Sequence, residues 1–243
     1  MPFLRVWEAS GKTFDSSPSP VAVIAVGSVE RHGDHLPLGT DTIVAHWIAE
    51  KVAEKLGAHL YPPIWFGSSK GLRDFRGTID VDDEALAKYL ESVLREIARN
   101  GYRMCIVING HGGNTAIVRI VARRTAFSTG MTIVVVDWWR DVAQEARSRL
   151  FTSPGHAGED ETSAVLCIDE KLVDMEAASS YIPSYVPKLS TYSPSIEREL
   201  YPRALLGDAT KASKDRGCRW LEEIVDEIVN EVRELAKKLG IEI

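Results

Sequence analysis

The sequence of 243 residues lacks several features that would assign it to a specialised class. Its three cysteines, Cys105, Cys167 and Cys218, are odd in number and widely spaced. This excludes a disulfide-dense secreted scaffold and predicts reduced core thiols in a cytoplasmic protein. No apolar run reaches the length of a membrane-spanning helix. Residues 1–8 contain no basic segment leading into an apolar stretch, so we expect no signal peptide.

Positive charge is also scarce. Lys and Arg number 29 against 35 Asp and Glu, a formal net charge of −6, and the chain has no basic block. We therefore expect neither nucleic acid nor an anionic membrane as a partner. Internal repeats and low-complexity segments are absent. The length, with 44% hydrophobic and 26% charged residues, fits a single globular α/β domain spanning residues 1–243.

The chain does contain a regular alternation of buried strands and helices. Three unbroken apolar runs, each followed by Gly, Asn or Asp, are typical of strands buried on both faces: residues 21–26, 104–108 and 132–136. A shorter strand is expected at residues 59–61. Apolar spacing and stop signals predict five helices, at residues 41–56, 82–99, 114–127, 159–168 and 211–239. This order predicts an α/β fold, a three-layer sandwich with a mostly parallel central sheet.

Residues 179–202 are rich in Ser, Pro and Tyr and are predicted to form a long loop. Tyrosine is enriched at protein interfaces, so the tyrosines of this region predict a contact between subunits. They are Tyr181, Tyr185, Tyr192 and Tyr201.

Ligands of such folds bind beyond the carboxyl ends of the strands, where the loops after the three long strands should converge. The loop after the first strand contains Glu30, His32, Asp34, His35 and Asp41. Glu30 and His32 are two residues apart, so in an extended loop their side chains point in different directions. They could then serve two different metal ions, or one ion and one outer contact. Asp41 begins the next helix, and its two carboxylate oxygens could bridge two cations.

Two later loops carry the same kinds of side chain. Residues 109–114 place His111 among glycines that allow close approach of the backbone to a ligand. Residues 155–163 contain His156, Glu159 and Glu161. Taken singly, such residues are explained as turn residues, helix caps or acids at a helix N-terminus. Taken together, histidines and carboxylates without cysteine favour a site for zinc, manganese or ferrous iron.

These segments together resemble the signatures of the creatininase (creatinine amidohydrolase) family. The resemblance covers roughly residues 20–165, in matching order and spacing, and rests on Val26–Thr42, Asn109–Asn114, His156–Ser163 and, more weakly, Phe75–Ile79. It implies a creatininase-like fold and a binuclear metal amidohydrolase that cleaves non-peptide C–N bonds of a small-molecule substrate. It also implies a homo-oligomer, with a hexamer as the form typical of the family.

The resemblance implies two divalent ions per chain, Zn, Mn or Fe(II). Glu30 and His111 would hold one, His32 would hold the other, and Asp41 would bridge both. Creatininase has a further glutamate ligand two residues after the histidine of its second motif, where this chain has Gly113.

Glu161 or Glu159 could replace that ligand. Two residues apart on a helix, they face different ways, so at most one should reach the metal. Glu161 shares a face with Ala164 and Val165, which should point inward, so we favour Glu161 and place Glu159 either near the substrate or behind the metal ligands as an outer contact. His156 is the candidate general acid because an imidazole suits proton transfer near neutral pH. Glu159 is the second candidate, and Asn109 and Asn114 could orient ligands or bind the oxyanion.

The substrate is the least determined feature. The family includes creatininases, a peptide-trimming enzyme of the mycofactocin pathway, and archaeal-type formamidopyrimidine deformylases of flavin and deazaflavin biosynthesis. This chain has Gly112 where creatininase has an aromatic residue, which disfavours creatinine. Lys70, Arg73 and Arg76 could bind a phosphate, which favours the deformylase, or could be solvated loop charges.

The sequence leaves three alternatives to formamidopyrimidine deformylation. The first is hydrolysis of creatinine or another cyclic amide. The second is a catalytically silent family member that acts as a binding or scaffold protein, suggested by the missing glutamate ligand. The third is a nucleotide-binding α/β module without metal.

Overall fold

A computed structural model describes residues 3–243. Its central sheet has five parallel strands in the order β1-β3-β2-β4-β5. Their bounds are Leu4–Arg5 (β1), Val21–Val26 (β2), His59–Leu60 (β3), Met104–Asn109 (β4) and Thr132–Asp137 (β5). All residues of β2 and β4 are buried, as their unbroken apolar runs predicted. The predicted α/β fold with a parallel central sheet is confirmed.

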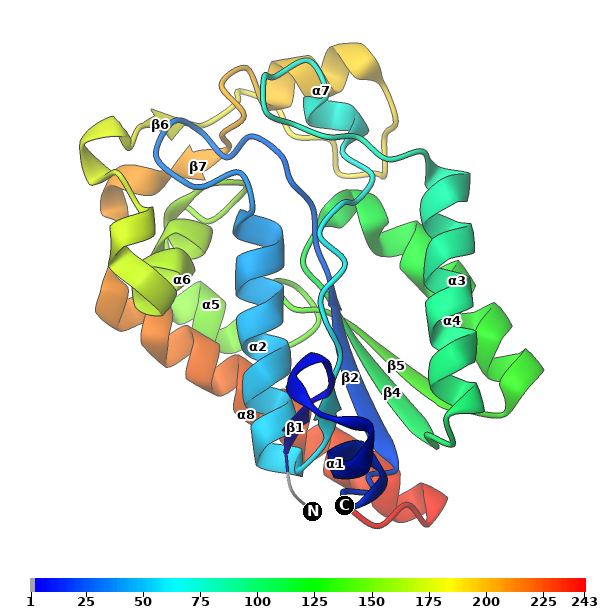
Figure 1. The fold of residues 1–243 in the computed structure, drawn as a ribbon. Helices are drawn as coiled ribbons and strands as arrows, with labels where there is room; N and C mark the ends of the chain where they lie inside the picture. The colour runs from blue at the N-terminus through cyan, green and yellow to red at the C-terminus, as the bar shows by residue number, and fades with distance from the viewer. Residues whose placement is uncertain (1–2) are drawn as a thin grey trace.

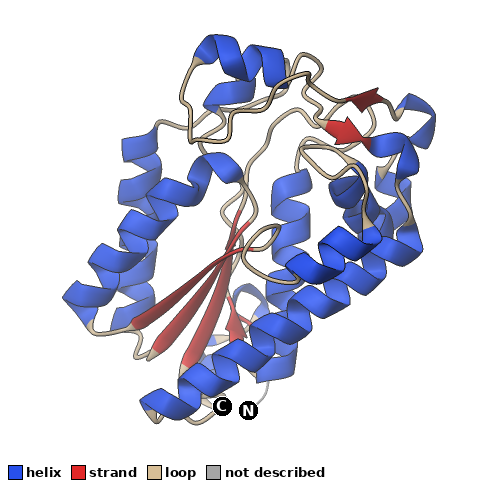
Figure 2. Ribbon diagram, turned by 180° about the vertical axis from the view of Figure 1, so that it is seen from behind, coloured by secondary structure: helices blue, strands red, loops and turns tan. Residues whose placement is uncertain are grey.

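Helices cover both faces of the sheet (Figures 1 and 2). Alternate residues of β2 point to opposite layers, because side chains alternate along a strand. Val21, Val23 and Ala25 belong to the core under one set of helices: α2 (Thr40–Leu56), α5 (Gln144–Leu150), α6 (Glu159–Asp169) and α8 (Lys214–Leu239). Ala22 and Ile24 belong to the core under the other set: α3 (Asp83–Arg99) and α4 (Thr115–Thr129).

The segment expected to be one long loop contains regular structure. Strand β6 (Ser180–Tyr181) pairs antiparallel with β7 (Gly207–Asp208), and helix α7 (Pro194–Leu200) lies between them in sequence. Figure 1 shows α7 beyond the carboxyl ends of the strands. The prediction also missed β1 and α1 (Gly11–Asp15). Elements this short have no room for a hydrophobic period, so their sequences carry little signal.

Two of the three cysteines form a disulfide. Cys167 in α6 is bonded to Cys218 in α8, while Cys105 is a buried free thiol in β4. The expectation of three reduced thiols is therefore wrong for this pair. Packing of α6 against α8 brings the two Cα atoms to 5.1 Å across 51 residues of sequence, a tertiary contact that cysteine spacing could not reveal. The cysteines thus no longer argue for a reducing compartment.

Membrane-spanning helices were not expected. Among residues 3–243, no helix has both the length and the apolar character needed to cross a membrane.

Candidate metal centre

Glu30 lies in the loop that follows β2, and its side chain is 1% exposed. The loop is held in place because the backbone N–H of Glu30 donates to the carbonyl of Leu38 at 2.8 Å. Neither carboxylate oxygen has a hydrogen-bond partner among residues 3–243, and burial raises the pKa of this carboxyl group. Buried polar atoms are normally hydrogen-bonded. Two orphaned carboxylate oxygens therefore indicate a ligand for a cation.

Asp41, in the first turn of α2, lies between two histidines. Its Oδ1 is 3.1 Å from Nε2 of His32, and its Oδ2 is 2.9 Å from Nδ1 of His111. Ser28 donates its hydroxyl to Oδ2 at 2.8 Å. Burial opposes ionisation of Asp41, but the two facing imidazoles outweigh it and hold the pKa of this carboxyl group well below its usual range.

A backbone carbonyl orients each of the two histidines. Nδ1 of His32 is 3.1 Å from the carbonyl oxygen of Glu30, and Nε2 of His111 is 2.8 Å from that of Ser68. A ring N–H donated to a carbonyl fixes the tautomer and leaves the other nitrogen to face the carboxylates. Burial alone would lower the pKa of both rings. The facing carboxylates outweigh it and raise the pKa of His32 to about 10 and of His111 to about 9. The carboxylates of the cluster thus favour positive charge beside them.

The candidate ligands form overlapping clusters, in each of which the ligand atoms lie within 4.8 Å of one another. The clusters are Glu30–Asp41–His111, His32–Asp41–Glu161 and Glu30–His32–His156. Asp41 belongs to the first two, which together contain all five side chains expected as ligands. Carboxylates and imidazoles suit zinc, manganese and ferrous iron. The residues present therefore fit a pair of divalent cations that share Asp41.

Glu159 and Glu161 have separate environments although they share the first turn of α6. Oε2 of Glu161 is 3.8 Å from Nε2 of His32 and accepts the backbone N–H of Ala157 at 2.7 Å. Burial, with Asp41 nearby, raises the pKa of Glu161 to about 8.

Glu159 is 1% exposed, and its carboxylate points into a network of protein donors. It is 2.5 Å from Nη1 of Arg216, and it accepts the backbone N–H groups of Thr152 and Ser153 at 2.7 and 2.8 Å. It does not line the pocket. Of the two expected places for Glu159, the structure does not support the one on the substrate side.

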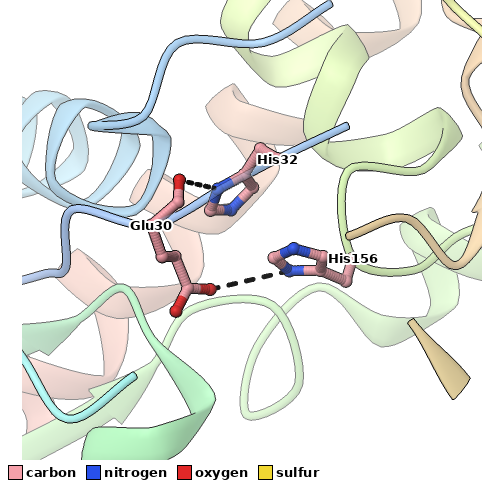
Figure 3. A group of neighbouring side chains, drawn as sticks. All are labelled: Glu30, His32 and His156. Carbon is pink, nitrogen blue, oxygen red and sulfur yellow. Dashed lines mark hydrogen bonds and ion pairs between the residues drawn. The ribbon is translucent and has the colours of Figure 1, made fainter. Parts of the chain in front are cut away.

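His156 lies beside Glu30 and His32 (Figure 3). Its ring centroid is 4.2 Å from that of His32, and its Nδ1 is 3.8 Å from Oε1 of Glu30. Nε2 is 3.0 Å from the carbonyl oxygen of Arg31, so the proton sits on Nε2 and the lone pair of Nδ1 faces the cluster. Burial, helped by His32, lowers the pKa of His156 to about 3. The ring is therefore neutral.

Gly113 explains why a glutamate ligand is absent at this position. A Cβ atom there would lie 2.0 Å from the carbonyl oxygen of Ser68 and 2.6 Å from Nε2 of His111. The loop before α3 therefore occupies the space that a side chain would need.

The two asparagines hold the loops that carry the ligands. Asn109 donates to the carbonyl of His111 at 2.9 Å and to Asp137 at 2.6 Å. Asn114 accepts the N–H of Ser68 at 2.9 Å and donates to the carbonyl of Gly27 at 2.9 Å. Neither lines the pocket. Both therefore orient the backbone, and the expected alternative role at the oxyanion has no geometric support.

Two polar residues of the first loop lie outside the cluster. Asp34 is exposed and forms an ion pair with Arg31. Nε2 of His35 is 2.8 Å from the hydroxyl of Thr162.

A pocket of about 590 Å³ opens onto the cluster. Tyr192 and Tyr201 line it, and the ring of Tyr201 stands edge-on to that of His156 at 5.5 Å between centroids. Tyr181 donates its hydroxyl to the carbonyl of Glu199 at 2.8 Å. Three of the four tyrosines expected at a subunit interface thus have roles within this chain.

Of the two alternatives for Lys70, Arg73 and Arg76, the phosphate-binding cluster is not assembled. Arg73 and Arg76 are exposed and do not line the pocket. Lys70 does line it, but its ammonium group is 2.6 Å from Asp83. Three further lining residues, Trp139, Arg147 and Glu197, were missed because their local sequence carries no motif.

Comparisons with known proteins agree with this geometry. The Creatininase family model, described as creatinine amidohydrolase, matches residues 7–232. The creatinine amidohydrolase of Pseudomonas putida is 28% identical over 88% of this chain and 89% of that protein. The mycofactocin precursor peptide peptidase of Mycobacterium ulcerans is 32% identical over 93% of this chain and 90% of its own length.

A 2-amino-5-formylamino-6-ribosylaminopyrimidin-4(3H)-one 5'-monophosphate deformylase from Methanothermobacter thermautotrophicus is 25% identical over 94% of both chains. A solved structure described as creatininase Mn superposes with a TM-score of 0.84, covering 96% of this chain and 98% of that one at 26% identity.

Proposed function

The chain belongs to the creatininase family of metal-dependent hydrolases, and on this premise we propose that it cleaves an amide or formamide C–N bond at a centre of two divalent cations. Glu30, Asp41 and His111 would hold one cation. His32, Asp41 and Glu161 would hold the other. The observation that carries the proposal is the shared Asp41, whose two oxygens face the two histidines at 3.1 and 2.9 Å.

Two such cations would activate a water and polarise the amide carbonyl. The protein itself supplies orientation and proton transfer. His156 is the proposed general acid that protonates the leaving nitrogen, which otherwise departs poorly. The carbonyl of Arg31 orients its ring so that Nδ1 faces the cluster.

The specific substrate we propose is a formamidopyrimidine ribonucleotide of flavin or deazaflavin biosynthesis. The similarity to the deformylase over 94% of both chains supports this, as does a pocket volume in the usual range for small-molecule sites. Creatinine or another cyclic amide is the second candidate, supported by the similarity to creatinine amidohydrolase. We also propose a homo-oligomer in the cytoplasm.

The test begins with metal content per chain, measured by plasma mass spectrometry on protein purified without a metal-affinity tag. About two ions of zinc, manganese or iron are expected. Formate release from the formamidopyrimidine ribonucleotide is then compared with turnover of creatinine and of a mycofactocin precursor peptide. A metal content near zero that persists after incubation with these metals would refute the centre and favour a binding or scaffold protein.

A further inference from the structure

Arg147, on α5, lines the pocket but has no part in the proposed chemistry. Its Nε and Nη2 both donate to Oδ2 of Asp160, at 2.9 and 2.6 Å. The side chain is 21% exposed, whereas that of Asp160 is 1% exposed. Its guanidinium carbon also lies 5.9 Å from the centroid of the Trp220 ring. Its Nη1, by contrast, makes no hydrogen bond to any residue between 3 and 243 and is not among the buried unpaired atoms.

The two bonds to Asp160 hold the Nε–Nη2 edge of the Arg147 guanidinium and leave Nη1 free to donate to a ligand. Asp160 is itself fixed, because its Oδ1 accepts the backbone N–H of Gly155 at 2.8 Å. A guanidinium stays charged at any physiological pH and donates in a fixed fork that matches carboxylate and phosphate oxygens. Because Arg147 is already ordered by Asp160, an incoming anion would lose little affinity to immobilising this side chain.

The other charged residues of the pocket lining favour binding of an anion at Arg147. Among the described residues, Lys70 is the only other Lys or Arg of the lining, and it pairs with Asp83 at 2.6 Å as Arg147 pairs with Asp160. Glu197 adds a negative charge near Gly71, where a Cβ atom would lie 2.5 Å from Oε2 of Glu197. The additional negative charge of Glu197 at the Lys70 end, together with the free Nη1 of Arg147, therefore favours an anionic group at Arg147.

We infer that Arg147 forms an anion subsite of this pocket and that the substrate is an amide carrying a carboxylate or a phosphate group. This inference rests on the proposed function, because the amide is taken to lie at the carboxylate–histidine cluster. Asp160, which orders Arg147, is adjacent in sequence to Glu161, so the subsite and the cluster share the first turn of α6.

The test measures binding of three formamides to the metal-loaded protein by calorimetry. The neutral probe is N-(2-hydroxyethyl)formamide, the carboxylate probe is N-formylglycine, and the phosphate probe is 2-formamidoethyl phosphate. A charge-assisted hydrogen bond predicts that at least one anionic probe binds about tenfold or more tightly than the neutral one. Whichever anion binds more tightly identifies carboxylate or phosphate as the group recognised.

Two variants separate recognition from structure. Arg147→Lys keeps a positive charge beside Asp160 but loses the fork, so the preference for the anion should fall to about threefold or less. Arg149→Lys is the matched control: Arg149 is on the same helix, is exposed and pairs with Glu223 outside the pocket. It should retain the full preference.

Equal binding of all three probes to the unmodified protein would overturn the subsite. So would an Arg147→Lys protein that loses affinity for all three probes alike, because Arg147 would then only position the Gly155–Glu161 turn. Formate release, followed separately, tests the proposed function. An anion preference without formate release keeps the subsite and rejects formamide hydrolysis, whereas formate release without a preference rejects only the subsite.

Discussion

The floor and the roof of the pocket are built in different ways. The floor is the set of five candidate ligands: Glu30, His32, Asp41, His111 and Glu161. Their side chains are at most 15% exposed, and backbone groups hold three of them, His32, His111 and Glu161. The roof is the segment 182–206, which includes α7. It exposes most of its side chains, Tyr192 to 88%.

This contrast separates chemistry from substrate choice. Charged groups in the floor are costly to bury, so each must be held by a partner or a cation, and a small displacement would leave one unpaired. The roof buries little apolar surface, so its side chains can change without loss of the fold. We therefore expect floor variants to change metal binding and roof variants to change substrate affinity alone.

The largest effect is expected from Asp41→Ala, because Asp41 belongs to both ligand clusters. Loss of a single outer contact to a metal ligand costs roughly 10- to 100-fold, so removal of the shared ligand should lower activity by more than about 100-fold. Metal content should fall from about two ions per chain to below one. Mass spectrometry of the purified variant checks this, and an unchanged content of two would show that Asp41 bridges nothing.

Gly113→Glu, which restores the glutamate present in creatininase, should impair the floor rather than improve it. The new Cβ would lie 2.0 Å from the carbonyl oxygen of Ser68, and such overpacking typically costs about 1–3 kcal/mol. Metal affinity should drop at least about tenfold, because His111 is displaced. Gly112→Ala is the control, since its Cβ would meet only Trp139 at 3.9 Å. Tighter metal binding by Gly113→Glu would contradict this view of the floor.

Separate substitution of Glu161 and Glu159 by Gln should distinguish a residue that binds metal from one that stabilises the fold. Glu161→Gln should weaken metal binding about 10- to 100-fold with little change in stability. Glu159→Gln should leave metal content unchanged but lower the free energy of unfolding by about 2–3 kcal/mol, because it weakens charge-assisted bonds to Arg216 and to two backbone N–H groups. Urea unfolding and a metal titration of both variants check the division, and matching profiles would contradict it.

The same contrast explains which parts of the fold and of the candidate site could be predicted from the sequence. Glu30, His111 and Asp41 could be placed together because each follows or precedes a buried strand or helix whose pattern is strong. Helix periodicity also favoured Glu161 over Glu159, although whether either binds metal stays a prediction. Packing patterns thus predict both the fold and where the polar loops meet.

The features that were not predicted from the sequence depend on contacts between distant segments. Arg147 looks like an ordinary surface residue of a short helix, and only Asp160 gives it a fixed edge. The bond between Cys167 and Cys218 depends on how α6 packs on α8. The pairing of Tyr201 with His156 joins two loops that are distant in sequence, while the subunit contact expected of Tyr201 stays a prediction. No local period encodes these pairings.

The smallest effect is expected in the roof. Tyr201→Ala removes a ring that stands edge-on to His156. Tyr201 also lines the pocket, and an aromatic contact to the substrate would contribute about 0.5–1.5 kcal/mol, so KM should rise about 2- to 10-fold while metal content stays at its original value. Tyr185→Ala is the matched control, because Tyr185 is 63% exposed and does not line the pocket. If Tyr201→Ala instead loses metal, the roof supports the floor, and chemistry and substrate choice are not separable in this protein.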